Sequence, residues 1–251
     1  MSIGLEDATD ALRTAVLDGA FTPGSKLREV SVSENLGVSR TLARLAMSAL
    51  EHEGLLERIP NRGSRVRSFS ISQIADAIEV RGELEGMAVR RAAERGLSDN
   101  ACKPLRDLIA QSEELLTAGV DTEERRQAWV DINVAFHNGL IEASGNWALS
   151  IAIKQISALP LVSSTAIIFD RKNFDRSQRQ LRAAHDDHIR ILNAVCDGRG
   201  HRAEALMREH AFMNAQNKRT NLSDRATLDL VRDLPGGKLV SAATSQKGGA
   251  D

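Results

Sequence analysis

The chain has 251 residues, of which 42% are hydrophobic, and its formal net charge is -1. This length allows one large domain or two small ones with a real core, and the near-zero charge excludes a protein that binds nucleic acid through bulk attraction alone. Aromatic residues make up only 3% and tyrosine is absent, so aliphatic side chains must fill the core.

The expected compartment follows from the cysteines and from the lack of apolar runs. Cys102 and Cys196 give no disulfide framework and no C-x-x-C motif, and both lie in apolar helical sequence, so we expect buried free thiols. Glu6, Asp7 and Asp10 argue against a signal peptide, and no apolar run approaches membrane-spanning length. We therefore expect a cytoplasmic protein that does not contact a membrane.

The first 68 residues predict three short helices followed by a hairpin. Apolar residues recur at helical spacing, Gly19 and Gly37 end the first two helices, and Ser39 is placed to cap the third. The helices are expected over 5–18, about 30–36 and from 39 to about 52, with strand-like runs on both sides of the turn PNRG at 60–63. This order predicts a winged helix-turn-helix domain over residues 1–68.

The third helix and the hairpin carry the candidate DNA contacts. Arg40, Thr41 and Arg44 lie off the apolar side of the helix, in its first two turns. The hairpin segment 58–67 contains four arginines and no acidic residue. Such a pattern suits a major groove and the adjacent backbone or minor groove. The alternative is a solvated helix face beside an arginine-rich turn.

The rest of the chain predicts an all-helical domain over 72–220, preceded by a short linker at 67–72. Glycines fall at or near the breaks between helices, as expected of helix C-termini, and Ser98 and Asp121 are plausible N-caps. The helices are expected near 72–95, 98–118, 121–144, 146–169, 175–198 and 200–220. Residues 221–251 are expected to be disordered. The fold class is therefore mainly α, with one small β-hairpin.

These patterns together resemble a known family of bacterial regulators. Residues 8–69 resemble the winged-helix domain of GntR-type regulators, through PG-x-x-L at 23–27, LGVSRT at 36–41 and PNRG at 60–63. Residues 72–220 resemble the helical FCD effector domain of the FadR-like branch. Its traces are EVRGELEGMAVRRAA at 79–93, N-x-x-FH at 133–137, EASGN at 142–146 and the His188 to His210 segment.

The resemblance implies which residues contact DNA. Ser39, Arg40, Thr41 and Arg44 would face the groove, and Arg62 and Gly63 would form the tip of the wing, where glycine allows close approach to the backbone. An arginine can pair bidentately with guanine. The chain departs from the family at Leu42, Ala43 and Leu45, where proline, valine and an acidic residue are common, so an unusual operator or fewer contacts are expected.

A metal site is implied by an asparagine and three histidines. Asn133 and His137 share one helix face, and His188 and His210 lie on two later helices, so the four can converge inside a bundle. Nitrogen-rich ligands suit zinc best, with nickel, manganese, cobalt or iron as alternatives. The family more often has aspartate at the Asn133 position, so the neutral asparagine is expected to bind the metal less tightly. Each histidine could instead be a hydrogen-bonded core or surface residue.

Other charged residues of the second domain have less specific interpretations. His185 could support the site from one turn before His188, and His201 is expected to be exposed. Arg81, which matches a recurrent FCD arginine, is expected to clamp a small carboxylate effector. The alternative for Arg81 is a structural salt bridge with Glu85.

The function predicted from these features is a ligand-responsive transcriptional regulator, most readily a repressor, and not an enzyme. A homodimer would present two winged helices to a near-palindromic, double-stranded operator. The alternatives are a metal-dependent hydrolase, which lacks a glutamate placed as in H-E-x-x-H, and an architectural DNA-binding protein without an effector.

Overall fold

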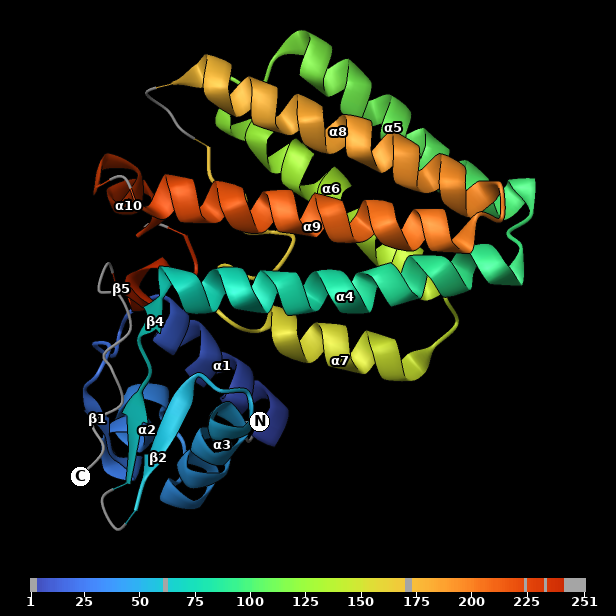
Figure 1. Cartoon of the computed structure of the whole chain (residues 1–251). Coiled ribbons are helices and arrows are strands. Elements are labelled where there is room, and N and C mark those ends of the chain that lie inside the picture. The colour runs from blue at the N-terminus through green and yellow to red at the C-terminus, as the bar shows by residue number, and fades with distance from the viewer. Residues whose placement is uncertain (1–3, 61–62, 170–172, 224, 233, 242–251) are drawn as a thin grey trace, which may run out of the picture. The chain divides into compact units, whose positions relative to one another are not determined.

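The computed structural model describes residues 4–60, 63–169, 173–223, 225–232 and 234–241, and these are mainly helical, with small sheets. Figure 1 shows the elements in chain order. They form two compact units. One contains Met1–Ile74, Ala158–Leu161 and Leu222–Asp251, and the other contains Ala75–Ser157 and Val162–Asn221. The mainly α fold predicted from the sequence is confirmed.

Over the described residues up to Ser70, the first unit has three helices and a three-stranded antiparallel sheet of order β1-β3-β2. Its elements are α1 (Leu5–Leu17), β1 (Lys26–Leu27), α2 (Glu29–Leu36), α3 (Arg40–His52), β2 (Leu56–Ile59), β3 (Gly63–Val66) and β4 (Phe69–Ser70). β2 and β3 form the expected hairpin, in which Arg58 is opposite Ser64 and Ile59 is opposite Gly63. This is the winged helix-turn-helix arrangement.

The core of the first unit lies between α1 and α3. Leu12 and Val16 of α1, and Ala46 and Leu50 of α3, are fully buried, as their helical spacing requires. A salt bridge between Arg13 and Glu53, 2.6 Å long, also joins α1 to the end of α3. These contacts hold α3 by its apolar side and leave its opposite side exposed.

The segment expected to be a disordered tail is largely structured in its described part. α9 extends to Ser223 and is followed by α10 (Arg225–Val231), the 3-10 helix Gly237–Leu239 and β5 (Val240–Ser241), which pairs in parallel with β4. Leu239 is fully buried, and the Gly236 amide donates to the Leu17 carbonyl at 3.0 Å. Local composition did not reveal this packing against the end of α1. Residues 242–251 lie outside the described residues.

The second unit is an all-helical bundle (Figure 1). Its helices are α4 (Ile71–Arg95), α5 (Asp99–Ala118), α6 (Glu123–Ala143), α7 (Trp147–Ser157), α8 (Phe174–Cys196) and α9 (Gly200–Ser223). The helix expected over 146–169 ends at Ser157, before Pro160, which has no backbone N–H to donate, and Leu161, which has a positive φ of 59°. Thr122, rather than Asp121, accepts the capping hydrogen bond of α6.

Apolar side chains fill the bundle, with Phe136 and Leu140 of α6 packed against Ile191 and Val195 of α8.

The expectation of two free thiols is wrong, because Cys102 of α5 and Cys196 of α8 form a disulfide. Sequence spacing could not reveal this pair, since 94 residues separate the two cysteines. Their Cα atoms lie 6.3 Å apart, within the range that a disulfide can bridge.

α4 and α9 pack closely because α4 has a glycine at the contact. A Cβ atom at Gly82 would overlap the Cβ of Ala211, so a larger residue would force the helices apart. One turn further along α4, Glu85 is buried with a relative exposure of 3%. The Glu85 carboxylate thus lies inside the bundle, close to the contact between α4 and α9.

Candidate metal centre and nucleic-acid interface

Two exposed arginines, Arg40 and Arg44, lie in the first turns of α3. Ser39 is the N-cap, since its hydroxyl accepts a hydrogen bond from the Leu42 amide at 3.2 Å. Arg40, Thr41 and Arg44 are exposed. Arg40 and Arg44 share a helix face, and within the described residues neither has a salt-bridge partner. Their guanidinium groups are therefore available to an external anion.

The wing is less cationic than its sequence indicates. Arg65 pairs with Glu57 at 3.0 Å, and Arg58 approaches Glu51 at 4.0 Å. Gly63 is exposed at the start of β3 with a φ of 85°, a left-handed conformation that glycine adopts without strain. Arg62 lies outside the described residues. Arg28, which sequence reasoning missed, is a further exposed arginine at the N-terminus of α2.

Three of the predicted metal ligands meet inside the second unit. His137 of α6, His188 of α8 and His210 of α9 are buried, and one nitrogen atom from each lies within 4.8 Å of the others. A tetrahedral ion that binds nitrogen at about 2.1 Å holds two such atoms roughly 3.4 Å apart. The rings are therefore within a small inward shift of a metal-binding geometry.

Two carboxylates orient the rings of this cluster. The Nδ1 atom of His137 donates to Glu85 Oε2 at 3.0 Å, and Nδ1 of His210 donates to Asp187 Oδ2 at 3.2 Å. A proton on Nδ1 leaves the Nε2 lone pair free, which is the tautomer that a carboxylate–histidine–metal arrangement needs. Sequence reasoning missed both supports, although Asp187 directly precedes His188.

His188 has a buried nitrogen without a partner. Among the described residues, no group hydrogen-bonds to its Nε2 atom. Burial, together with the neighbouring His210 and His137, holds the pKa of His188 well below its usual value. Burial also lowers the pKa of His210, although Asp187 opposes this effect. Neutral imidazoles with free lone pairs are metal ligands, so the donor set fits a divalent transition metal.

Asn133 lies close to the cluster in the chain and faces the same cavity as His210. It is buried one turn before His137 on α6, and its Nδ2 atom donates to the Ser164 carbonyl at 2.8 Å. This bond leaves the Oδ1 atom available as a neutral ligand. His185 is not part of the cluster, because its Nδ1 atom hydrogen-bonds with Ser112 and its Nε2 atom lies 2.9 Å from Glu113 Oε2. His201 is exposed, as expected.

Arg81 occupies a structural position rather than a cavity wall. It is 2% exposed, its Nε atom lies 3.2 Å from Glu85 Oε1, and its Nη1 atom donates to the Val162 carbonyl. Burial would raise the pKa of Glu85, but Arg81 and His137 outweigh it and lower this pKa to about 2. The salt-bridge interpretation of Arg81 therefore describes its contacts among the described residues, and Arg81 does not line the cavity beside the cluster.

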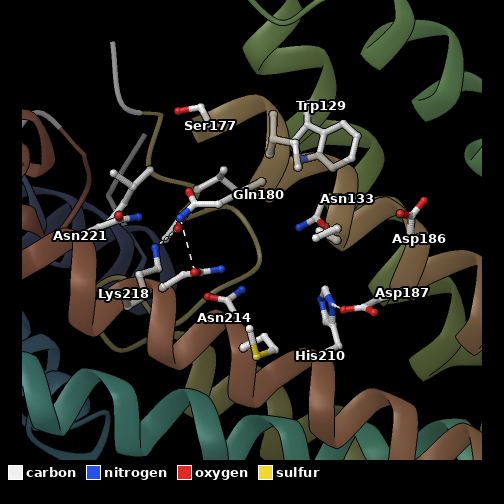
Figure 2. A pocket seen from close by; sticks show the side chains of 18 of the residues that line it. Trp129, Asn133, Ser177, Gln180, Asp186, Asp187, His210, Asn214, Lys218 and Asn221 are labelled. Atoms are coloured by element: carbon white, nitrogen blue, oxygen red, sulfur yellow. Dashed lines mark hydrogen bonds and ion pairs between the residues drawn. The ribbon is translucent and has the colours of Figure 1, made fainter. Parts of the chain in front are cut away.

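A cavity of about 490 Å³ opens beside the histidine cluster. Figure 2 shows Asn133, Asp187 and His210 at one part of its wall and Lys218 at another. Its volume lies within the range of small-molecule sites. Sequence reasoning missed Lys218, which had no motif to mark it.

Comparison with known proteins agrees with both units. The model of the FCD domain matches residues 76–212, and the model described as bacterial regulatory proteins, gntR family, matches residues 5–66. The HTH-type transcriptional regulator LutR of Bacillus subtilis is 28% identical, over 78% of this chain and 92% of its own length. The HTH-type transcriptional repressor GlaR of Escherichia coli is 27% identical, over 84% and 93%.

A solved structure supports the fold. The E. coli protein McbR/YncC matches with a TM-score of 0.57 and covers 88% of this chain and 98% of its own. Its sequence identity is 19%, so this likeness concerns the fold alone.

The Arg81–Glu85 pair gives a direct test of the structural role of Arg81. We expect Arg81→Met to lower the free energy of unfolding by about 3–5 kcal/mol, because it leaves the buried Glu85 carboxylate without its cation. The double variant Arg81→Met/Glu85→Gln should recover most of this loss, since its amide carries no charge and still accepts from His137. Urea denaturation of the three proteins measures both effects. A stable Arg81→Met protein that had lost only ligand affinity would contradict the structural role.

Proposed function

We propose, from the premise that this chain belongs to the GntR family of bacterial regulatory proteins and carries an FCD domain, that its helical unit binds a divalent metal and a small organic acid. The family makes the chain a DNA-binding transcriptional regulator with an effector domain. The observation that carries the proposal is the buried cluster of His137, His188 and His210 beside a cavity.

The DNA contacts that we propose lie at the start of α3 and at the wing. Arg40 and Arg44 are exposed and unpaired within the described residues, which suits the major groove. Ser39 and Thr41 would bind phosphate or base edges, and Gly63 would let the wing approach the backbone. We keep Arg62 as a contact on sequence grounds alone.

The proposed metal ligands are the three histidines, through their Nε2 atoms, and Asn133 through Oδ1. Zinc is our first choice, because three imidazoles and one oxygen donor are common zinc ligands. Nickel, manganese, cobalt or iron would also accept this set. A bound ion would give the effector carboxylate a positive partner, while Glu85 and Asp187 keep the rings in place.

The regulatory step that we propose is a change in operator affinity when the acid binds. Such coupling requires that the acid bind more tightly to one state of the protein than to the other. We propose that the protein represses transcription of its target genes. The printed name of GlaR describes that protein as a transcriptional repressor. As a bacterial regulator, the protein would bind DNA in the cytoplasm. No helix in the described ranges is long and apolar enough to cross a membrane.

We further propose that the protein is a homodimer. α7 packs through Leu149 and Ile153 onto Ala88 of α4, yet its Trp147 and Ile151 are 76% and 57% exposed. Large exposed apolar side chains on one helix favour a protein interface. A second copy is the occupant that we choose, because two winged helices would then address two half-sites.

The alternatives have less support. A hydrolase would need a general base beside the metal. The two carboxylates that contact the cluster, Glu85 and Asp187, are already hydrogen-bonded to His137 and His210. An architectural protein would not need a cavity beside a buried histidine cluster.

Replacement of Arg40 tests the DNA-binding face. A duplex selected by the wild-type protein from random sequence serves as operator, and a scrambled duplex serves as reference. Arg40→Ala should reduce the preference for the operator by about 5- to 150-fold, which corresponds to 1–3 kcal/mol for one bidentate base contact. Fluorescence anisotropy measures both affinities, with Arg91→Ala in α4 as the control. An unchanged preference would contradict the assignment.

Replacement of His188 tests the metal site. Protein purified without an affinity tag should carry one transition-metal ion per chain by elemental analysis, and His188→Gln should carry none. At a metal concentration of 100 times Kd, binding should stabilise the wild type by about 2.7 kcal/mol. The exposed His201→Gln is the control, and Asn133→Asp should bind more tightly because it adds a charged ligand. Equal metal content in the wild type and His188→Gln would refute the site.

Replacement of Ile151 tests the dimer. Ile151→Glu should shift the protein toward monomers at micromolar concentration, because it places a charge in the proposed apolar contact. Sedimentation velocity measures the change. Ala110→Glu, at an exposed position of α5, is the matched control and should remain dimeric. A wild-type monomer, or a dimeric Ile151→Glu protein, would rule out this interface.

A further inference from the structure

The buried Lys218 has no acidic partner in the described part of the chain. Its side chain on α9 is 5% exposed, and among the described residues its ammonium group donates to one acceptor, the Ala166 carbonyl. A buried charge is costly unless it is paired. Burial, with a smaller contribution from Arg81, lowers the pKa of Lys218 to about 7. An ammonium group has three N–H donors. The donors that do not bond to Ala166 remain available to a ligand.

Lys218 lines the same cavity as His210, and the two are separated along one helix. They lie eight residues apart on α9, which is about 12 Å along the helix axis. Figure 2 shows Asn214 between them. The cavity thus has two sites for anionic groups, the histidine cluster and Lys218.

Side-chain amides line the cavity near Lys218. Asn214 and Asn221 have no hydrogen-bond partner among the described residues, while Gln180 donates to Asn217 at 3.4 Å. An amide both donates and accepts, so this wall can bind carboxylate or hydroxyl oxygens. The carboxylate nearest the cluster, Asp187, is already bound to His210 and Arg190. The wall around the lysine is thus suited to an oxygen-rich anion.

We infer that the ligand of this cavity carries two acidic groups, one directed to the histidine cluster and the other paired with Lys218. This inference rests on the proposed function and gives the chemical class of its effector. His210 and Lys218 lie about 12 Å apart along the helix axis, so a short diacid, of about four to six carbons, is the class of ligand to compare.

The second acidic group gives specificity. A diacid supplies an acidic partner for the ammonium group, and the pair gains charge-assisted hydrogen bonds. A monoacid at the histidine cluster leaves that ammonium unpaired, and a site that leaves a buried polar group unpaired discriminates strongly. Lys218 is therefore a specificity-determining residue.

The experiment compares each diacid with its own half-amide. Succinate, malate, glutarate and adipate, and the corresponding half-amides, are titrated by calorimetry into the full-length, metal-loaded protein. The wild type should bind at least one diacid more than about tenfold tighter than its half-amide, which is 1.4 kcal/mol. Lys218→Met should bind the two equally and keep the wild-type metal content. Lys154→Met, an exposed lysine of α7, should keep the discrimination.

The stability of the empty protein provides a second readout. Lys218→Met should melt at a higher temperature than the wild type without ligand, because it removes an unpaired buried charge. A discrimination that survives in Lys218→Met, or a wild type that prefers no diacid over its half-amide, would overturn the inference. Failure of the proposed function would be recognised separately, by the absence of metal or by acid binding that leaves operator affinity unchanged.

Discussion

The interaction on which the effector site depends is the buried ion pair of Arg81 and Glu85 on α4. Without the cation, burial would favour a protonated glutamic acid, which could not serve as a full charge partner for His137. With the cation, Glu85 stays ionised and fixes the proton of His137 on Nδ1. The arginine that sequence reasoning proposed as a ligand clamp thus pairs with the carboxylate that contacts His137, one of the proposed metal ligands.

The low dielectric around the buried cluster makes any unpaired polar group there costly in free energy. Polar groups around the cluster need partners, and among the described residues His188 Nε2 has no hydrogen-bond partner and Lys218 has no acidic one. An unsatisfied buried group generally costs free energy. Both groups lie in one bundle, and they identify two ends of a ligand site. A metal ion and a diacid would satisfy them together, and this would give the empty and loaded proteins different stabilities.

The two halves of the chain use charge in opposite ways. In the first unit, Arg40 and Arg44 remain exposed and unpaired within the described residues, although the segment has no net cationic excess. Specific binding must then come from a few base contacts rather than from bulk attraction. In the second unit the important charges are buried: Glu85 is paired with Arg81, and Lys218 has no acidic partner among the described residues, so these groups respond to a ligand rather than to salt. This division suits a regulator that reads DNA at one site and a metabolite at another.

The sequence by itself determined the elements of the winged helix, most helices of the bundle and the Ser39 cap, because helical periodicity and capping are local properties of the chain. The histidines that meet were implied by the family resemblance. The tertiary structure decided between the two interpretations of Arg81, and only it decided the disulfide of Cys102 and Cys196, the packing of Leu239 and the burial of Lys218, which depend on contacts between segments far apart in the chain. Burial and pairing change the chemistry of a side chain without leaving a local pattern in the sequence.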